Sequence, residues 1–314
     1  MYYPYLRGRQ FELIALREFA LQHGDTNNVI PIIEPVKNTF NSMKLAIPKL
    51  IEGNVKFALI LNPNEGDFNN GSNTIHLITE ELKTELADTS KWIPSFLLTN
   101  NYQMVTDFIN EFWFQNVMLI CSDITDSSNE QFEELVMMPQ VKFIVSKENR
   151  TLLRKLKNKD KILIRLDDNF NAQKRNKDYL SVPEEKFTEE HLYYKDDNYG
   201  GFSDYTILVS DFTEGGGAPY AVSIHLTYEK TNKEVWVRHF TSETNDDIAN
   251  IQGKFAEAAA KAIQFLDEKS IFTIASNELR HYYQEGKYPG LGMVKKISIK
   301  NHMELMNNII NTSV

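Results

Sequence analysis

The chain has 314 residues, of which 42% are hydrophobic and 25% charged, a composition that excludes a disordered chain and allows a sizeable core. Its formal net charge of −9 argues against nucleic-acid binding through phosphate contacts as the main function. Cys121 is the single cysteine, so no intrachain disulfide can form, and no uncharged apolar run approaches the length of a membrane span. These features predict a cytoplasmic protein without a membrane partner.

Short apolar runs that end on a polar residue recur along the chain, and a helix-like segment follows each of them. The runs cover residues 2–6, 29–33, 57–61, 93–98, 117–121, 141–145, 162–166 and 205–209. Strands that alternate with helices favour parallel pairing through crossovers, and eight such units are what a closed barrel needs. The sequence therefore predicts an α/β fold, a (β/α)8 TIM-type barrel, in a single domain over residues 1–314.

Helical spacing of apolar residues predicts the segments that return the chain between these strands. The expected helices cover residues 9–23, 41–52, 74–86, 102–114, 129–137 and 149–156. The alternation breaks after the seventh strand, where residues 168–203 are charged and rich in tyrosine. We expect a long loop there, and loops of this length are usually functional or mobile.

A second departure follows the predicted eighth strand. Val222, Ile224 and Leu226 alternate with polar residues, and a short turn joins them to a second run, so we expect a β-hairpin inserted over residues 215–242. An alanine-rich helix is predicted over residues 247–268. The remaining residues, 270–314, are expected to form a C-terminal helical extension, with helices at 276–284 and 300–310.

Strand ends converge on one face of a closed barrel, and active sites of this fold lie on that face. The polar residues at the predicted ends are therefore the first candidates for a site. They are Arg7, Glu34, Asn62, Asp123, Lys147, Arg165, Asp167 and Asp211. The alternative is that polar residues simply mark where each strand leaves the core, or cap the following helix.

Among these candidates, Glu34, Asp167 and Asp211 are the predicted catalytic carboxylates. Glu34 follows an apolar strand and precedes Pro35, so it could serve as a general base or a metal ligand, or instead form a structural ion pair with Arg7 or Lys37. Carboxylate oxygens could hold Mg²⁺, but residues from different strands follow no spacing rule, so the sequence identifies no metal or cofactor. Arg7, Lys147 and Arg165 are expected to hold an anionic ligand, and Asn62 to contact it.

Two histidines are expected to meet across the predicted hairpin. A satisfied polar pair is favoured over a metal site, but His225 could act as an acid or base if the hairpin covers the barrel mouth, with His239 contacting a ligand. No cysteine or carboxylate stands beside them at zinc-ligand spacing. Gly-x-Ser-x-Gly, Cys-x-x-Cys, His-Glu-x-x-His and Walker-type motifs are absent, so motif-based hydrolase, redox, zincin and NTPase assignments are excluded.

Several segments resemble the bacterial "beta protein" family. They are Tyr-Leu-Arg-Gly-Arg-Gln-Phe-Glu at 5–12, Ile-Glu-Pro-Val-Lys at 33–37, Asp-Asp-Asn-Phe-Asn at 167–171, Ala-Pro-Tyr-Ala-Val-Ser-Ile-His at 218–225 and Tyr-Pro-Gly-Leu-Gly at 288–292. The resemblance implies an accessory-gene protein in a phage-defence or toxin-linked pair. It brings no established reaction and no catalytic residues.

Two functions remain open on this reading. In the first, the barrel is a binding partner or sensor whose partner is the neighbouring-gene protein or a phage product. In the second, it is a metal-assisted enzyme that acts on a phosphorylated or nucleotide-like substrate at the barrel mouth, which is an argument from the fold alone. The sequence does not decide whether the protein is an enzyme.

Overall fold

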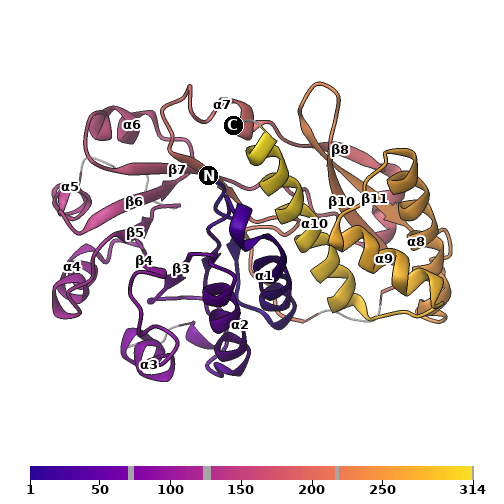
Figure 1. Ribbon diagram of the computed structural model, residues 1–314, viewed down its shortest axis with the longest axis horizontal. Coiled ribbons are helices and arrows are strands. Elements are labelled where there is room, and N and C mark those ends of the chain that lie inside the picture. Colours follow the sequence, from indigo (N-terminus) through magenta and orange to yellow (C-terminus); the bar gives the residue numbers. More distant parts are fainter. Residues whose placement is uncertain (70–73, 123–128, 216–218, 313–314) are drawn as a thin grey trace.

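The computed structural model describes residues 1–69, 74–122, 129–215 and 219–312. Its larger sheet has eight parallel strands, and they follow one another in chain order (Figure 1). The strands are β1 (Tyr5–Leu6), β2 (Ile32–Ile33), β3 (Phe57–Ile60), β4 (Trp92–Leu97), β5 (Val117–Ile120), β6 (Val141–Ser146), β7 (Ile162–Asp167) and β9 (Gly201–Asp204).

Residues just before β1 join the two edges of this sheet. Tyr2 forms a parallel bridge with Val29 on one side and with Phe202 on the other. The N–H group of Tyr3 also donates a 2.9 Å hydrogen bond to the carbonyl oxygen of Phe202. The sheet therefore closes into the predicted (β/α)8 barrel.

Helices cover the outside of the barrel at the predicted places, although α3 and α4 end earlier than predicted, at residues 81 and 111 instead of 86 and 114. They are α1 (Gln10–His23), α2 (Asn41–Glu52), α3 (Thr74–Glu81), α4 (Tyr102–Glu111), α5 (Glu130–Met137) and α6 (Arg150–Leu156). In α1, Leu13, Leu16 and Ala20 are buried at intervals of three and four residues, so one face of the helix packs on the strands.

The eighth barrel strand lies earlier than predicted. It is β9, residues 201–204, whereas the expected segment 205–209 runs over the mouth as turns. Thr206 has a φ of 58° and its N–H group donates to the Asp204 carboxylate, which ends the strand. A Cβ atom on Gly201 would lie 2.5 Å from the Tyr3 ring, so the glycine allows the close approach that completes the ring.

Residues 168–203, predicted as a long loop, contain regular structure instead. They form the 3₁₀ helix η3 (Asn176–Ser181), strand β8 (Glu184–Thr188), the short helix α7 (Glu190–Tyr193) and barrel strand β9. Strand β8 pairs with the edge of a separate antiparallel sheet. The sequence did not predict this strand because it is charged: β8 lies at the edge of the sheet, and only Phe187 and Thr188 in it are buried.

The predicted hairpin is present as β10 (Ser223–Glu229) and β11 (Val235–Thr241), in the sheet order β10-β11-β8. Residues 216–218 of the expected insertion lie outside the described residues. Helix α8 (Ile251–Glu268) packs Phe255 and Phe265 against this hairpin. It begins at residue 251 rather than 247 because the Asn250 side chain caps its first turn.

The C-terminal extension is helical, as predicted, with longer helices. These are α9 (Ile274–Gln284) and α10 (Leu291–Thr312), and α10 lies between the barrel helix α1 and the hairpin (Figure 1). Within α10, Lys296 and Lys300 are buried and both pair with Glu18 and Glu278. Because these buried residues are charged, hydrophobic spacing predicted only residues 300–310 as helix and missed the first part of α10.

Side chains on alternate strand positions fill the interior of the barrel, while their neighbours face the outer helices. The interior cluster includes Tyr5, Ile32, Val145, Ile164 and Leu166. The side chain two positions after the last interior residue of a strand therefore projects into the barrel mouth. Within the described residues, no helix combines the length and apolarity needed to cross a bilayer.

Candidate functional site

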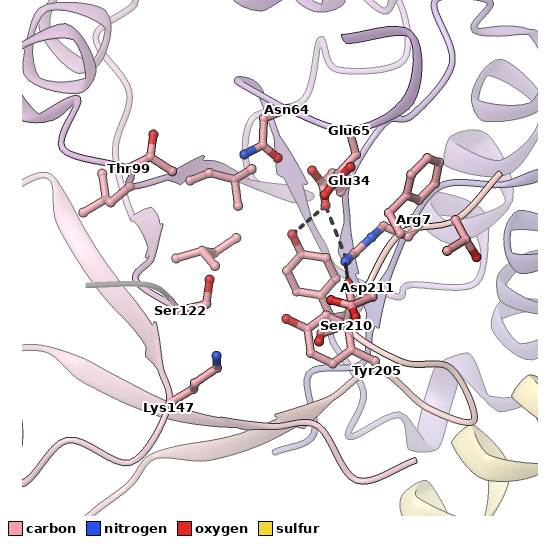
Figure 2. Close-up of a pocket in the computed structure, with 16 residues that line it drawn as sticks. Arg7, Glu34, Asn64, Glu65, Thr99, Ser122, Lys147, Tyr205, Ser210 and Asp211 are labelled. Carbon is pink, nitrogen blue, oxygen red and sulfur yellow. Dashed lines mark hydrogen bonds and ion pairs between the residues drawn. The ribbon is translucent and has the colours of Figure 1, made fainter. Parts of the chain in front are cut away.

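A polar cavity of about 590 Å³ opens at the carboxyl ends of the barrel strands (Figure 2). This volume lies within the ~300–1,000 Å³ range of small-molecule sites. The cavity is lined by Tyr5, Arg7, Glu34, Asn64, Glu65, Leu97, Leu98, Thr99, Ile120, Ser122, Lys147, Tyr205, Ser210, Asp211, Phe212 and Thr213.

Strand alternation explains why residues distant in sequence meet in this cavity. Arg7 lies two residues after the interior side chain of Tyr5, and Glu34 lies two residues after Ile32. Lys147 stands in the same relation to Val145. Of the nine candidate residues for catalysis or ligand binding, the structure therefore brings Arg7, Glu34, Lys147 and Asp211 to one cavity.

Glu34 is a buried carboxylate at one wall of the cavity, with 1% of the residue exposed. The Tyr5 hydroxyl donates a 2.7 Å hydrogen bond to Oε2, and Arg7 Nη1 lies 3.4 Å from the same oxygen. Burial raises the pKa of Glu34, while the charge of Arg7 and the hydrogen bond from Tyr5 oppose the rise. A buried carboxyl group with a raised pKa is suited to proton transfer.

Arg7 is fixed from several sides. Its Nη2 donates to the carbonyl oxygen of Ser210, and its guanidinium carbon lies 4.8 Å from the ring centroid of Tyr5 and 5.2 Å from that of Tyr205. These contacts hold the cation beside Glu34, so it stabilises the ionised carboxylate in a site with little water.

The segment after β9 forms one wall of the mouth. Ser210 binds Arg7 through its carbonyl oxygen, and its hydroxyl donates a 2.6 Å hydrogen bond to Asp168. Arg9 donates to the carbonyl oxygen of Thr213. Asp211 is exposed and borders the cavity from this segment. It thus reaches the mouth from a loop seven residues beyond β9, and not from a strand end.

Lys147 lies on the opposite side of the cavity from Arg7 and Glu34. Figure 2 shows it at the end of β6, beside Ser122, with its amino group turned into the cavity. Lys147 is exposed, unlike Glu34. The mouth therefore carries Lys147 at an open wall and the Arg7–Glu34 ion pair at a buried wall, together with the carboxylates of Glu65 and Asp211.

Asn62 is placed differently from the prediction, because both ends of its amide bind the neighbouring strand. Its Nδ2 donates to the carbonyl oxygen of Leu97, and the N–H group of Leu97 donates to Asn62 Oδ1, both at 2.8 Å. It is not among the residues that line the cavity. Asn62 thus extends the pairing of β3 with β4.

Arg165 and Asp167 lie outside the barrel. Ile164 and Leu166 occupy the interior positions of β7, so the alternate residues face outward. There Arg165 Nε lies 3.0 Å from Asp167 Oδ2, and Nη1 lies 3.1 Å from the Glu190 carboxylate. Burial raises the pKa of Asp167, and Arg165 opposes this rise. Both residues were wrongly expected in the mouth, because the prediction ignored strand alternation.

His225 and His239 meet across the hairpin, as expected, but away from the mouth. Their Nδ1 atoms are 2.7 Å apart, and Phe170 and Tyr179 pack against both rings. His239 Nε2 lies 3.3 Å from Glu185 Oε1. Neither histidine lines the cavity, so the arrangement is that of a buried polar pair.

The described residues contain no group of three His, Cys, Asp or Glu side chains arranged to hold a metal ion. Asp123, an expected strand-end residue, lies outside the described residues. Of the carboxylates considered for Mg²⁺, Glu34 and Asp211 both line the cavity, whereas Asp167 lies outside the barrel. Asp167 therefore cannot share a metal ion with Glu34.

Several lining residues were missed in the sequence. Tyr5 was read as part of a strand, and Asn64 and Glu65 as a connection. Ser122 and Ser210 carried no charge that would have marked them. Strand alternation would have identified Ser122, which lies two residues after the interior residue Ile120. No pattern in the sequence marks Asn64 or Ser210, because loop paths place them.

No family model and no curated protein matches the chain. Among solved structures, it is similar to FabK from Thermotoga maritima, with 9% identity and a TM-score of 0.38. The similarity covers 99% of this chain and 96% of that one. So distant a likeness carries no argument about the site, and the fold assignment stands on the strand order and the closure at Tyr2.

Proposed function

We propose that the barrel mouth binds a small phosphorylated or nucleotide-like molecule. The observation that carries this proposal is the convergence of Arg7, Glu34 and Lys147 on one polar cavity of about 590 Å³. Ligand sites of this fold lie at the same end of the barrel.

The two cations have different parts in this proposal. Lys147 offers an exposed ammonium group, which binds phosphate as a point charge. Arg7 is already neutralised by Glu34, so it contributes directional hydrogen bonds more than net charge. Thr99 and Ser122 add hydroxyl groups along the same cavity.

The proposal is tested by calorimetric titration of the protein with nucleotides and sugar phosphates at fixed ionic strength. Replacing Lys147 by Ala should weaken binding of the phosphorylated ligand at least tenfold, because a charge-assisted contact contributes about 1.5–3 kcal/mol. Lys157→Ala is a matched control, since Lys157 is exposed at the end of α6 on the outer layer. If no phosphorylated compound binds, or if Lys147→Ala binds equally well, the proposal is wrong.

An acid–base enzyme is the second candidate, and the burial of Glu34 favours it. Burial raises the pKa of Glu34 above its ordinary value, which favours proton exchange between this carboxyl group and a bound ligand. Incubating the bound ligand with the protein and following its NMR spectrum tests this. Turnover that Glu34→Gln abolishes while binding persists would support catalysis, and an unchanged ligand would leave the protein a binder.

The defence role implied by the resemblance stays a prediction. A barrel that binds a nucleotide-like molecule would suit the sensor of a two-gene pair, since such a ligand could report the state of an infected cell. Co-expression with the neighbouring-gene protein, followed by size-exclusion chromatography, tests the association. A failure to associate, together with unchanged phage plating after deletion of the gene, would contradict this prediction.

A further inference from the structure

The wall of the mouth formed by residues 205–213 begins at a strained turn. Thr206 has a φ of 58°, a left-handed backbone conformation that β-branched residues rarely adopt. Its side chain is buried, and no described residue provides a hydrogen-bond partner for its hydroxyl group. Strained residues persist only where surrounding contacts hold them, and they cluster at functional sites. The contacts that hold Thr206 therefore also determine where the wall begins.

Asp204 holds this turn from the other side of the barrel wall. Its buried carboxylate accepts, at Oδ1, a 2.8 Å hydrogen bond from the N–H group of Thr206 and a 2.6 Å hydrogen bond from the Tyr2 hydroxyl. The next residue, Tyr205, turns into the barrel, and its ring centroid lies 5.2 Å from the guanidinium carbon of Arg7. Asp204 thus fixes the start of a wall that packs against Arg7.

His302, a fully buried residue of α10, contacts the second oxygen of this carboxylate. Its Nε2 lies 3.4 Å from Asp204 Oδ2, and its Nδ1 lies 3.0 Å from the hydroxyl oxygen of Thr227 in β10. The amide of Asn301 donates to the same hydroxyl oxygen. The hydroxyl group can therefore donate to Nδ1, which leaves the proton of the neutral ring on Nε2, toward Asp204.

Resting on the proposed function, we infer that His302 is a positioning residue for the mouth. Through Asp204 it holds the turn at Thr206, and this turn places the wall 205–213 against Arg7. His302 is not one of the described residues that line the cavity. Helix α10 lies between the barrel and the hairpin (Figure 1), so the packing of this helix controls ligand binding at a site that His302 does not touch.

Two variants of His302 separate positioning from general packing. Glutamine places its amide nitrogen near the position of Nε2 and can still donate to Asp204. Asparagine is one methylene shorter, places its amide near Nδ1 and cannot reach Asp204. Both variants put a neutral amide at the same buried position, so a role in packing alone predicts similar effects from the two.

Hydrogen–deuterium exchange of residues 205–213, followed by mass spectrometry, measures the order of the wall without a ligand. We expect exchange to be about tenfold faster in His302→Asn than in the wild type, and nearly unchanged in His302→Gln. If His302→Asn does not fold, Asp204→Asn replaces it with the same expected result. Its amide has one acceptor oxygen, which cannot serve both Thr206 and His302.

Phe265→Leu is the control for a general loss of stability. Phe265 packs in the cluster between α8 and the hairpin, which does not include Asp204. This variant should lower the urea midpoint of unfolding but leave exchange of residues 205–213 unchanged, because the wall opens locally.

Calorimetric titration with ribose 5-phosphate measures the consequence for binding. His302→Asn should weaken the affinity for this probe about tenfold, whereas His302→Gln and Phe265→Leu should bind it as the wild type does. The recovery of affinity in His302→Gln is the result that a purely structural role of His302 does not predict.

The outcomes distinguish this inference from the proposed function. Equal exchange of residues 205–213 in the wild type, His302→Asn and His302→Gln, or an equal rise in both variants, would show that the inference is wrong. A faster exchange in His302→Asn with unchanged affinity would also overturn it, while phosphate binding stands. If no phosphorylated compound binds the wild type, the proposed function fails, and the exchange rates alone decide whether His302 orders the wall.

Discussion

Arg7 and Glu34 lie side by side at the ends of neighbouring barrel strands, with Arg7 Nη1 3.4 Å from Glu34 Oε2, and both side chains are nearly buried. The sequence left open whether Glu34 acts in a site or in a structural ion pair. In the structure Glu34 does both: its carboxylate lines the cavity and forms the ion pair with Arg7. The pair borders the cavity and is also nearly buried, so its contributions to stability and to binding need separate measurements.

Removing the charge of Arg7 alone should destabilise the protein strongly. Arg7→Met leaves Glu34 buried without its cation, and breaking a buried ion pair costs about 3–5 kcal/mol. The double variant Arg7→Met/Glu34→Gln should recover much of this loss, because no uncompensated charge remains. Urea unfolding of the wild type, both single variants and the double variant measures the coupling. Additive effects would show that the two charges do not interact.

Asn62 is expected to act in stability and not in binding. Asn62→Ala removes both hydrogen bonds to the backbone of Leu97, so the free energy of unfolding should fall by about 2 kcal/mol. Asn62→Asp should be as harmful, because a carboxylate cannot donate to the Leu97 carbonyl oxygen. Titration of both variants with the ligand of the wild type provides the check. A loss of affinity without a loss of stability would show instead that Asn62 contributes to ligand binding.

The barrel could be predicted from the sequence because each strand and helix follows local rules. The run 141–145 and the helix 149–156 reappear as β6 and α6 with shifts of one residue. The errors lie where long-range packing decides. Gly201 belongs to a strand because β7 pairs with it and Tyr3, which is distant in sequence, packs against it, and β8 is a strand because β11 supplies its partner.

The candidate site could be predicted in part, for a related reason. A polar residue at a strand end reaches the mouth only if it lies on the inward phase of the alternation. Arg7, Glu34 and Lys147 satisfy this condition, whereas Arg165 and Asp167 do not. Asn62 shows a further limit, since its amide binds the backbone instead of facing the cavity. The position of Ser210 depends on a loop path that no periodicity encodes.

Glu190 should make stability depend on pH. Burial raises the pKa of Glu190 to about 7, Arg165 opposes the rise and Asp167 adds to it. Because the folded-state pKa exceeds the ordinary value, the contribution is present at low pH and is lost as the pH rises from about 4.5 through 7. Relative to Glu190→Gln, the wild type should lose stability over this range, on the order of 1–2 kcal/mol after solvent screening.

Unfolding of the wild type and Glu190→Gln in urea at pH 4.5, 6, 7.5 and 8.5 tests this dependence. The difference between the two proteins matters, because titration of other groups cancels in it. Asp167→Asn should reduce the effect, since it removes a negative charge near Glu190. A difference that stays constant with pH would show that Glu190 titrates as an ordinary surface carboxyl group.

The histidine pair of the hairpin should also make stability depend on pH, but with the opposite sign to Glu190: stability should fall as the pH falls. His225 and His239 face each other through Nδ1 atoms 2.7 Å apart, so one donates, the other accepts, and both are neutral. Burial, followed by the charge of His239, lowers the pKa of His225 well below 6.5, and Lys295 lowers it further. Burial also lowers the pKa of His239, although Glu185 opposes the shift.

Because the folded-state pKa of His225 is depressed, the unfolded chain binds more protons below pH 6.5, and stability should fall as the pH falls. The expected slope is about 1.4 kcal/mol per pH unit for each extra proton bound by the unfolded state. His225→Leu should reduce the slope by about one proton, as measured by urea unfolding between pH 5 and 7.5. The exposed His281 supplies a control, His281→Gln, which should keep the wild-type slope. Equal slopes in the wild type and His225→Leu would mean that His225 binds protons equally well in the folded and the unfolded chain. The pair would then be open to water in solution, which would contradict the prediction.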